Sequence, residues 1–203
     1  MTPHNHPHLT PCGLPGIGPV PRGLHSCHFY NNRQQLVDAL IPYALAGLRA
    51  NERVLIIASR PLPARDLVRE LRQAWDGVDE AVHTGALRVL DFDRWYRDAA
   101  GLKSEDLVQL WLREEEQALA QGFSGLRVSG NISFLTPEEW PAFMAYEKSV
   151  TAAFSNRRVV ALCSYVLEDC TEDQKADVLR AHACAFERQD GDWRVVMSGT
   201  LRA

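Results

Sequence analysis

Continuous apolar runs constrain the fold of this chain more than any other feature of its sequence. Val54–Ala58 and Val159–Leu162 contain no polar residue. A strand of this kind is covered on both faces, as in a parallel sheet. Between such runs, apolar residues recur every three or four positions, which predicts amphipathic helices. A chain that alternates strands and helices in this way folds as an α/β protein with a largely parallel central sheet.

The order of the expected elements indicates three layers, with helices on both faces of the sheet. Thr136 followed by Pro137 and, at the third helical position, Glu139 is a strong helix start. Asp190-Gly191 is a hairpin turn signal, so residues 185–187 and 193–196 are expected to form an antiparallel C-terminal hairpin. We expect the remaining strands at residues 24–30, 53–59, 86–92, 125–129 and 158–166, and the helices at residues 33–50, 64–75, 105–122, 136–154 and 171–183.

The first 23 residues differ from the rest because they hold six prolines and four glycines. Proline removes a backbone donor, and glycine raises the entropic cost of order. We therefore expect residues 1–23 to be a flexible tail whose deletion leaves the melting temperature nearly unchanged, and residues 24–203 to be one domain. His4, His6 and His8 lie in this tail, where a metal would find no preformed geometry and would bind weakly.

Charge, cysteine content and hydropathy exclude several classes of protein. The chain has 22 Lys and Arg against 26 Asp and Glu, a formal net charge of -4. Proteins that bind nucleic acid electrostatically are usually basic, so direct nucleic-acid binding is not expected. No apolar run approaches the ~20 residues of a membrane span, and no secretory signal is visible. Five cysteines in 203 residues indicate reduced thiols and a cytoplasmic protein.

Ligands of parallel α/β proteins bind beyond the carboxyl ends of the strands, so the residues there decide the chemistry. A phosphate-binding loop after the first strand needs glycines and a lysine. The turn Tyr30–Arg33 has neither, which argues against nucleotide hydrolysis. A Gly-x-Ser-x-Gly nucleophile elbow is also missing from the sequence.

A metal site is weighed from the segment His25-Ser26-Cys27-His28. On a strand His25 and Cys27 face the same side, so they could share a metal with Cys163 or His182. The sequence has no Cys-x-x-Cys pair, which disfavours a structural zinc site. Cys163 lies in an apolar run and is read first as a small core residue.

Arg127 stands in an otherwise apolar strand, so its charge needs a partner or a ligand. Glu147, on the following helix, lies among apolar residues and is the expected partner. A structural Arg127–Glu147 ion pair and a ligand contact by Arg127 both remain open from the sequence.

The motifs resemble those of the MEDS domain, a sensory domain of methanogens and methylotrophs found in the dichloromethane-responsive regulator. Each motif is modest, but their order and spacing from Leu24 to Val196 are specific together. They are His25-x-Cys27-x-Phe29-Tyr30, Leu36, Leu40-x-Pro42-Tyr43-x-x-x-Gly47-Leu48, Glu52-x-Val54-Leu55, Gly122-Phe123-x-Gly125-Leu126-Arg127-Val128-Ser129-Gly130, Tyr146-Glu147, Leu162-Cys163-x-Tyr165 and His182.

The resemblance implies a RecA- or KaiC-like fold without a phosphate-binding loop. It also implies a noncatalytic sensor in prokaryotic signal transduction and transcription regulation that binds a small organic molecule, such as a simple hydrocarbon derivative. Related proteins carry kinase, anti-sigma or DNA-binding modules, so a signalling partner of that kind is expected. We expect the ligand at the carboxyl ends of the strands, in contact with His25, Cys27, Tyr30, Arg127, Glu147, Cys163 and His182.

Two alternatives belong to other functional classes. A degenerate ATPase-like module that binds a protein would combine an occluded strand-end cleft with an exposed apolar patch. A thiol-dependent enzyme would use Cys163 or Cys27 and would need a strongly lowered thiol pKa beside a histidine.

Overall fold

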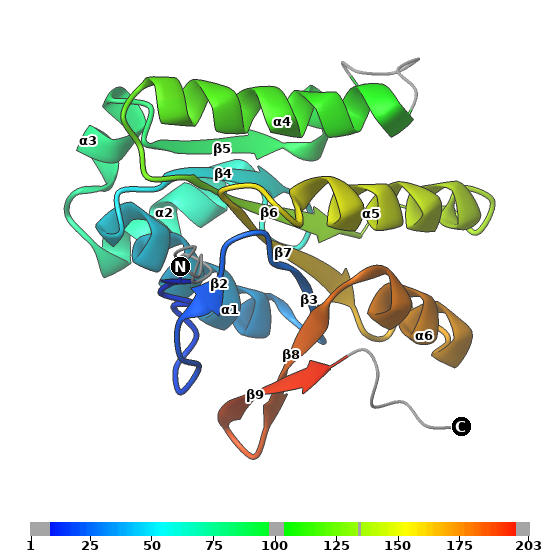
Figure 1. Cartoon of the computed structure of the whole chain (residues 1–203). Coiled ribbons are helices and arrows are strands. Elements are labelled where there is room, and N and C mark those ends of the chain that lie inside the picture. Colours follow the sequence, from blue (N-terminus) through cyan, green and yellow to red (C-terminus); the bar gives the residue numbers. More distant parts are fainter. Residues whose placement is uncertain (1–8, 98–103, 134, 198–203) are drawn as a thin grey trace, which may run out of the picture.

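The computed structural model describes residues 9–97, 104–133 and 135–197, and these residues form a central seven-stranded sheet and a separate two-stranded one (Figure 1). The strand order is β5-β4-β6-β7-β3-β8-β9, and every neighbouring pair is parallel except β8 with β9. The predicted α/β fold with a mostly parallel sheet and an antiparallel C-terminal hairpin is confirmed. The strands are β3 (His25–Tyr30), β4 (Arg53–Ala58), β5 (Leu87–Asp91), β6 (Leu126–Ile132), β7 (Val159–Val166), β8 (Cys184–Gln189) and β9 (Asp192–Met197).

Helices cover both faces of the sheet, and the apolar runs explain why. Within β4, Val54 and Ile56 pack into one apolar core, whereas Leu55 and Ile57 pack into another. Both sets are buried because successive side chains of a strand point to opposite faces. The first core includes α1 (Arg33–Arg49), α2 (Ala64–Ala74) and α3 (Val78–His83); the second includes α4 (Ser104–Ala120) and α5 (Trp140–Phe154); a third, smaller core includes α6 (Glu172–Ala181).

Local signals place most element ends within a few residues. Thr171 caps α6 in a reciprocal capping box with Gln174, and Asp190 and Gly191 adopt the positive φ angles, 54° and 93°, of a hairpin turn. Thr136 and Glu139 also exchange hydrogen bonds of 2.9 and 3.4 Å, but regular helix begins only at Trp140. The short helix α3 and the π-helical turn η1 (Asp93–Arg97) were not expected from the sequence.

The expectation of a flexible tail is wrong for residues 9–23. Leu9–Thr10 (β1) pairs with Val20–Pro21 (β2), and Leu14 between them is 2% exposed. Gly13 has a φ of +94°, and a Cβ there would lie 2.4 Å from the carbonyl oxygen of Pro42, so the segment packs directly on α1. Proline and glycine here permit an irregular but fixed path. Residues 1–8, with His4, His6 and His8, lie outside the described residues.

No helix in the described part of the chain combines the length and the apolar character needed to cross a membrane.

Candidate functional site

Arg127 and Glu147 lie on opposite faces of the sheet, so the expected ion pair between them is wrong. Arg127 Nε instead donates to Glu52 Oε2 at 2.7 Å, and both side chains are fully buried. Val128, the next residue of β6, packs into the core that contains α5, which carries Glu147. Since neighbouring side chains of a strand alternate in direction, Arg127 must point away from α5.

The guanidinium of Arg127 holds the N-terminal segment against the sheet. It donates to the carbonyl oxygens of Pro11 at 2.6 Å and Cys12 at 2.9 Å, and it lies 4.6 Å from the ring centre of Tyr43. Thr10 Oγ1 donates to Glu52 Oε1 at 2.8 Å and completes the network. Arg127 is therefore a structural clamp in this fold and not a neighbour of the other expected ligand contacts.

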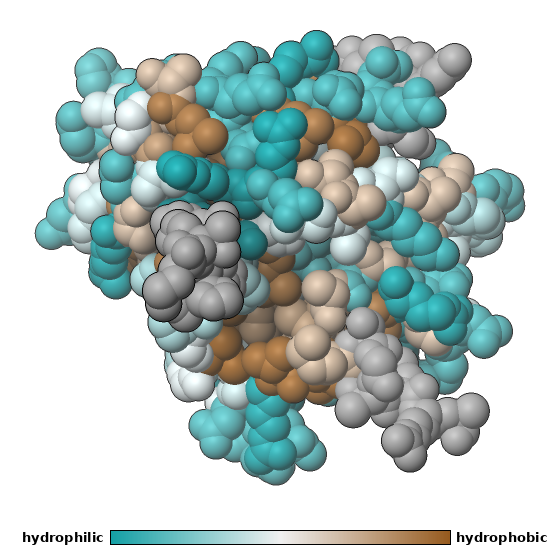
Figure 2. Space-filling view, viewed as in Figure 1, coloured by the Kyte–Doolittle hydropathy of each residue, from teal (hydrophilic) through white to brown (hydrophobic). Residues whose placement is uncertain are grey.

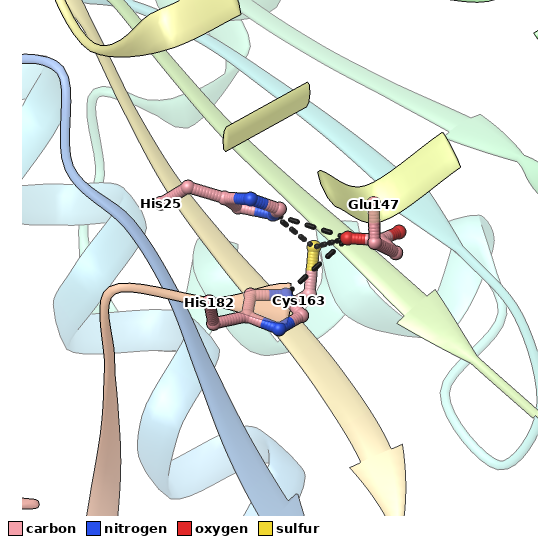
Figure 3. Close-up of side chains that lie close together, drawn as sticks. All are labelled: His25, Glu147, Cys163 and His182. Atoms are coloured by element: carbon pink, nitrogen blue, oxygen red, sulfur yellow. Dashed lines mark hydrogen bonds and ion pairs between the residues drawn. The ribbon is translucent and has the colours of Figure 1, made fainter. Parts of the chain in front are cut away.

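Four of the seven expected ligand contacts meet between the sheet and the helices α5 and α6 (Figure 3). We call this group the buried centre; its members are His25, Glu147, Cys163 and His182. They come from the first residue of β3, the middle of α5, the middle of β7 and the position directly after α6. One nitrogen, oxygen or sulfur atom from each lies within 4.8 Å of those of the other three.

The distances within the buried centre are short. His25 Nε2 lies 3.2 Å from Glu147 Oε2 and 3.2 Å from Cys163 Sγ. Glu147 Oε2 also lies 3.3 Å from His182 Nε2 and 3.7 Å from Cys163 Sγ. One carboxylate oxygen thus faces two imidazole nitrogens and one thiol.

Hydrogen bonds outside the centre orient both imidazole rings. His182 Nδ1 lies 2.7 Å from the carbonyl oxygen of Val178, which can only accept, so Nδ1 carries a proton. Thr151 donates its hydroxyl proton to the carbonyl oxygen of Ala181 at 2.5 Å, so its oxygen accepts from His25 Nδ1 at 2.7 Å. In the neutral rings, both Nε2 atoms therefore present lone pairs to the centre.

Burial and mutual interaction shift the pKa values in the centre. Burial, together with the neighbouring His182, lowers the pKa of His25 to about 4 despite the attraction of Glu147. Burial alone would raise the pKa of Glu147, but His182 and His25 outweigh it and lower that pKa to about 2. Burial and the Glu147 carboxylate raise the pKa of Cys163 well above its ordinary value. The centre thus holds the carboxylate of Glu147 beside the protonated thiol of Cys163.

A small cavity of ≈ 20 Å³ borders the centre. Its walls are mainly aromatic and aliphatic, and Trp111 Nε1 donates to the hydroxyl of Tyr146 at 2.7 Å. The cavity lies against the face of the sheet that α5 covers and not beyond the carboxyl ends of the strands, where we expected it. Its lining includes Tyr96, Trp111, Val128, Gly130, Tyr146, Val150 and Phe154, with His25, Glu147 and Cys163.

Tyr30 and Cys27 lie outside the buried centre. The hydroxyl of Tyr30 donates to Asn131 Oδ1 at 2.7 Å, and Asn131 Nδ2 donates to the carbonyl oxygens of Ser59 and Arg60. Polar side chains and backbone carbonyl oxygens therefore satisfy one another at the carboxyl ends of β3, β4 and β6. Cys27 Sγ lies 3.8 Å from the carbonyl oxygen of Cys184 and is fully buried.

A larger hollow of ≈ 500 Å³ lies at the carboxyl end of β3, beside the β8–β9 hairpin. His28 lines it, and neither of its ring nitrogens has a hydrogen-bond partner among the described residues. Burial lowers the pKa of His28 to about 3, so the ring is neutral. A second hollow, of ≈ 140 Å³, lies at the carboxyl ends of β6 and β7, where Ile132, Ser133, Tyr165 and Val166 line it. Both hollows lie where the strand-end argument predicted a ligand.

Sequence reasoning missed several residues that shape the sites. Glu52, Thr151 and Asn131 have their roles only through neighbours 30 or more positions away in the chain. Signals were available for Glu52, which is an acidic residue directly before an apolar strand and part of the motif Glu52-x-Val54-Leu55, but they did not indicate its partner. No pattern in the sequence marks Thr151 as the residue that orients His25.

Comparison with known families decides the relationship. The family model of the methanogen/methylotroph, DcmR sensory domain (MEDS) matches residues 24–183, which include every member of the buried centre. The chain belongs to the MEDS family. No curated protein sequence matches this MEDS domain.

Among solved structures, this MEDS domain is similar to the KaiC-like protein of the hyperthermophilic archaeon Pyrococcus horikoshii. The TM-score is 0.60 at 13% sequence identity, and the match covers 98% of this chain and 92% of that protein. At this identity the likeness concerns the fold alone. It confirms the expected KaiC-like architecture, in which the turn Tyr30–Arg33 lacks glycine and lysine.

Proposed function

We propose that this MEDS domain is a noncatalytic sensor in prokaryotic signal transduction or transcription regulation, and that it binds a small organic molecule in the cavity beside the buried centre. The sensory role follows from the family. The ligand class, a simple hydrocarbon derivative, and the dependence on a signalling partner such as a kinase, an anti-sigma factor or a DNA-binding regulator are parts of the proposal.

One observation carries the proposal: an apolar, aromatic cavity ends on a cluster of buried polar side chains. Small-molecule sites combine apolar walls with a few placed polar groups in this way. A volume of ≈ 20 Å³ exceeds the ~10–15 Å³ that one water molecule needs. With its walls as they stand, the cavity has room for about one or two heavy atoms, so it suits part of a small organic ligand.

The carboxyl ends of the strands support a noncatalytic role over nucleotide chemistry. Ser59 Oγ donates to the carbonyl oxygen of Asn131 at 2.8 Å, and Ser133 Oγ donates to that of Arg60 at 2.8 Å. A nucleotide phosphate bound there would have to break this network. The turn Tyr30–Arg33 supplies no lysine to compensate.

Binding is tested with a panel of one- and two-carbon organic molecules, dichloromethane included, by thermal shift and tryptophan fluorescence. Trp111 lines the cavity, so a bound ligand should change its emission. Gly130→Ala is the diagnostic variant, because a Cβ at Gly130 would meet only Ile132 Cδ1, at 3.6 Å, and would occupy the cavity. The proposal predicts a folded variant with at least tenfold weaker binding.

Gly18→Ala is the matched control, because a Cβ there meets nothing within 4 Å and Gly18 does not line the cavity. It should bind like the unaltered protein. Equal binding by Gly130→Ala and Gly18→Ala would contradict the cavity as the ligand site. Loss of binding in Trp193→Ala instead would assign the ligand to the hollow that Trp193 and His28 line.

A protein-interaction module is the second candidate, and one surface favours it. Figure 2 shows apolar residues gathered over the β8–β9 region, and Val195 and Met197 of the edge strand β9 are 47% and 58% exposed. A partner bound at this edge should be lost in Val195→Lys, while the response to organic ligands stays the same.

The thiol-enzyme alternative lacks support, because the pKa of Cys163 and that of Cys27 are both raised well above their ordinary value.

A further inference from the structure

We infer that the buried centre binds one divalent transition-metal ion, with zinc as the best fit. The four ligand atoms are His25 Nε2, His182 Nε2, Cys163 Sγ and Glu147 Oε2. This inference goes beyond the proposed sensory function, because the ion would bind whether or not an organic molecule does. It also revises the expectation from the sequence, which disfavoured a metal site for lack of a Cys-x-x-Cys pair.

Four of the six spacings among the ligand atoms are close to the edges of a tetrahedral site, and all six lie within 4.8 Å. With zinc–nitrogen and zinc–oxygen bonds of about 2.0–2.1 Å and a zinc–sulfur bond of about 2.3 Å, a tetrahedron has N···O edges of about 3.3 Å and edges to sulfur of about 3.5 Å. The two N···O distances here are 3.2 and 3.3 Å. The distances from sulfur to His25 Nε2 and Glu147 Oε2 are 3.2 and 3.7 Å.

The two imidazole rings are held as metal ligands are held. A ligating histidine usually donates its other ring N–H to an oxygen, which fixes the tautomer and aims the lone pair at the ion. His25 does this through Thr151, and His182 through the carbonyl oxygen of Val178. Both acceptors are built into the packing of α5 and α6.

The centre without an ion leaves polar atoms without adequate partners. His182 Nε2 is buried and makes no hydrogen bond within the described residues, although Glu147 Oε2 lies 3.3 Å away. If His182 is neutral, its Nε2 lone pair and the Glu147 oxygen repel each other at this distance, so either a proton or a cation must lie between them. A divalent ion would satisfy both atoms at once.

Charge and ligand type favour zinc. Glu147 and a deprotonated Cys163 supply two negative charges, which a divalent ion neutralises inside a buried site. Two imidazoles, one thiolate and one carboxylate form a borderline-soft set, which suits zinc better than calcium or magnesium, whose sites are built from oxygen.

The test uses the full chain with His4, His6 and His8 replaced by alanine, so that binding at those residues is excluded. The protein is stripped with a chelator, and Co²⁺ is added as a spectroscopic substitute for zinc, with no organic ligand present. We expect one Co²⁺ per chain, the intense visible absorption of a tetrahedral ion and a thiolate-to-cobalt charge-transfer band. Zn²⁺ should displace the cobalt and abolish both signals.

Variants separate the centre from its surroundings. In competition with a chelator, Cys163→Ser and His182→Gln should each weaken zinc binding at least 100-fold, and Cys163→Ser should remove the charge-transfer band. Thr151→Val keeps all four ligand atoms but removes the acceptor for His25, so it should weaken binding by about 10- to 100-fold. Cys27→Ser is the matched control. The thiol of Cys27, in β3, is buried like that of Cys163 but is not among the four ligand atoms.

The protein in which only His4, His6 and His8 are replaced decides the matter, even if a variant of the centre does not fold. Weak octahedral cobalt absorption without a charge-transfer band, or no retained ion, would overturn the inference. A charge-transfer band lost in Cys27→Ser and kept in Cys163→Ser would do the same. Because no organic molecule is present, each of these failures leaves the proposed ligand sensing to its own test.

Discussion

The Arg127–Glu52 pair predicts a strong and specific coupling in stability. The perturbations are Arg127→Met, Glu52→Gln and the double variant. Arg127 and Glu52 have fully buried side chains, and Arg127 Nε donates to Glu52 Oε2 at 2.7 Å. Each single substitution leaves a buried group short of a partner.

The magnitude follows from what each variant leaves behind. Breaking a buried ion pair from one side typically costs ~3–5 kcal/mol. Arg127→Met should lie near the lower value, because Glu52 keeps Thr10 at 2.8 Å and Arg22 at 3.3 Å. Glu52→Gln should lie near the upper value, because the guanidinium stays buried with its charge unpaired. The double variant should then cost about 2–3 kcal/mol less than the sum of the two.

Urea unfolding measures these free energies, and the slope of the unfolding free energy against urea should stay constant across the variants. The matched control is the pair Arg127→Met and Glu147→Gln in metal-free protein, which lies across the sheet and should be additive within ~0.5 kcal/mol. Additive effects for Arg127 and Glu52, or coupling between Arg127 and Glu147, would refute Glu52 as the partner of Arg127.

Three further predictions concern the N-terminal segment, acid stability and the strand ends. Leu14→Ala should lower the free energy of unfolding by about 2–5 kcal/mol, because Leu14 is 2% exposed. If its denaturant curve coincides with that of the unaltered protein, the N-terminal segment is flexible after all. His28 has a folded-state pKa of about 3, so the unfolded chain binds more protons below pH ~6.5, and stability falls as the pH drops toward 3. From pH ~6.5 down to pH 5, His28 should lower the free energy of unfolding by about 2 kcal/mol, at ~1.4 kcal/mol per pH unit, and His28→Phe should remove this decrease. Parallel curves of stability against pH for the two proteins would argue against it. Purified protein should release no phosphate from ATP, since the turn Tyr30–Arg33 has no glycine or lysine; magnesium-dependent turnover that disappears on substitution of Asn131 would contradict this.

Much of the fold was predictable because its signals are local. The apolar run Val54–Ala58 indicates a strand covered on both faces, Thr171 marks the start of α6, and Asp190-Gly191 marks the final turn. The N-terminal segment was not predictable, since its proline and glycine content indicates irregular backbone but not whether that backbone is packed. What fixes it is a guanidinium more than 100 positions away in the chain.

The buried centre was predictable in part. Alternation along a strand predicts that His25 and Cys27 share one face of β3, and the family resemblance singled out all four members of the buried centre. The partner of Arg127 depends on register instead: β4 and β6 align Val54 with Arg127, and Glu52 lies just before β4. Periodicity within one element carries no information on such pairing, so Glu147 was chosen wrongly.

X-ray absorption at the zinc edge of the zinc-loaded protein tests the central claim, that the buried centre is one preformed binding site. We expect four ligand atoms around the zinc, with one sulfur at about 2.3 Å and three nitrogen or oxygen atoms at about 2.0–2.1 Å. In Cys163→Ser the sulfur shell should vanish, and in Cys27→Ser it should remain. A six-coordinate shell of oxygen and nitrogen without sulfur in the unaltered protein would contradict the account.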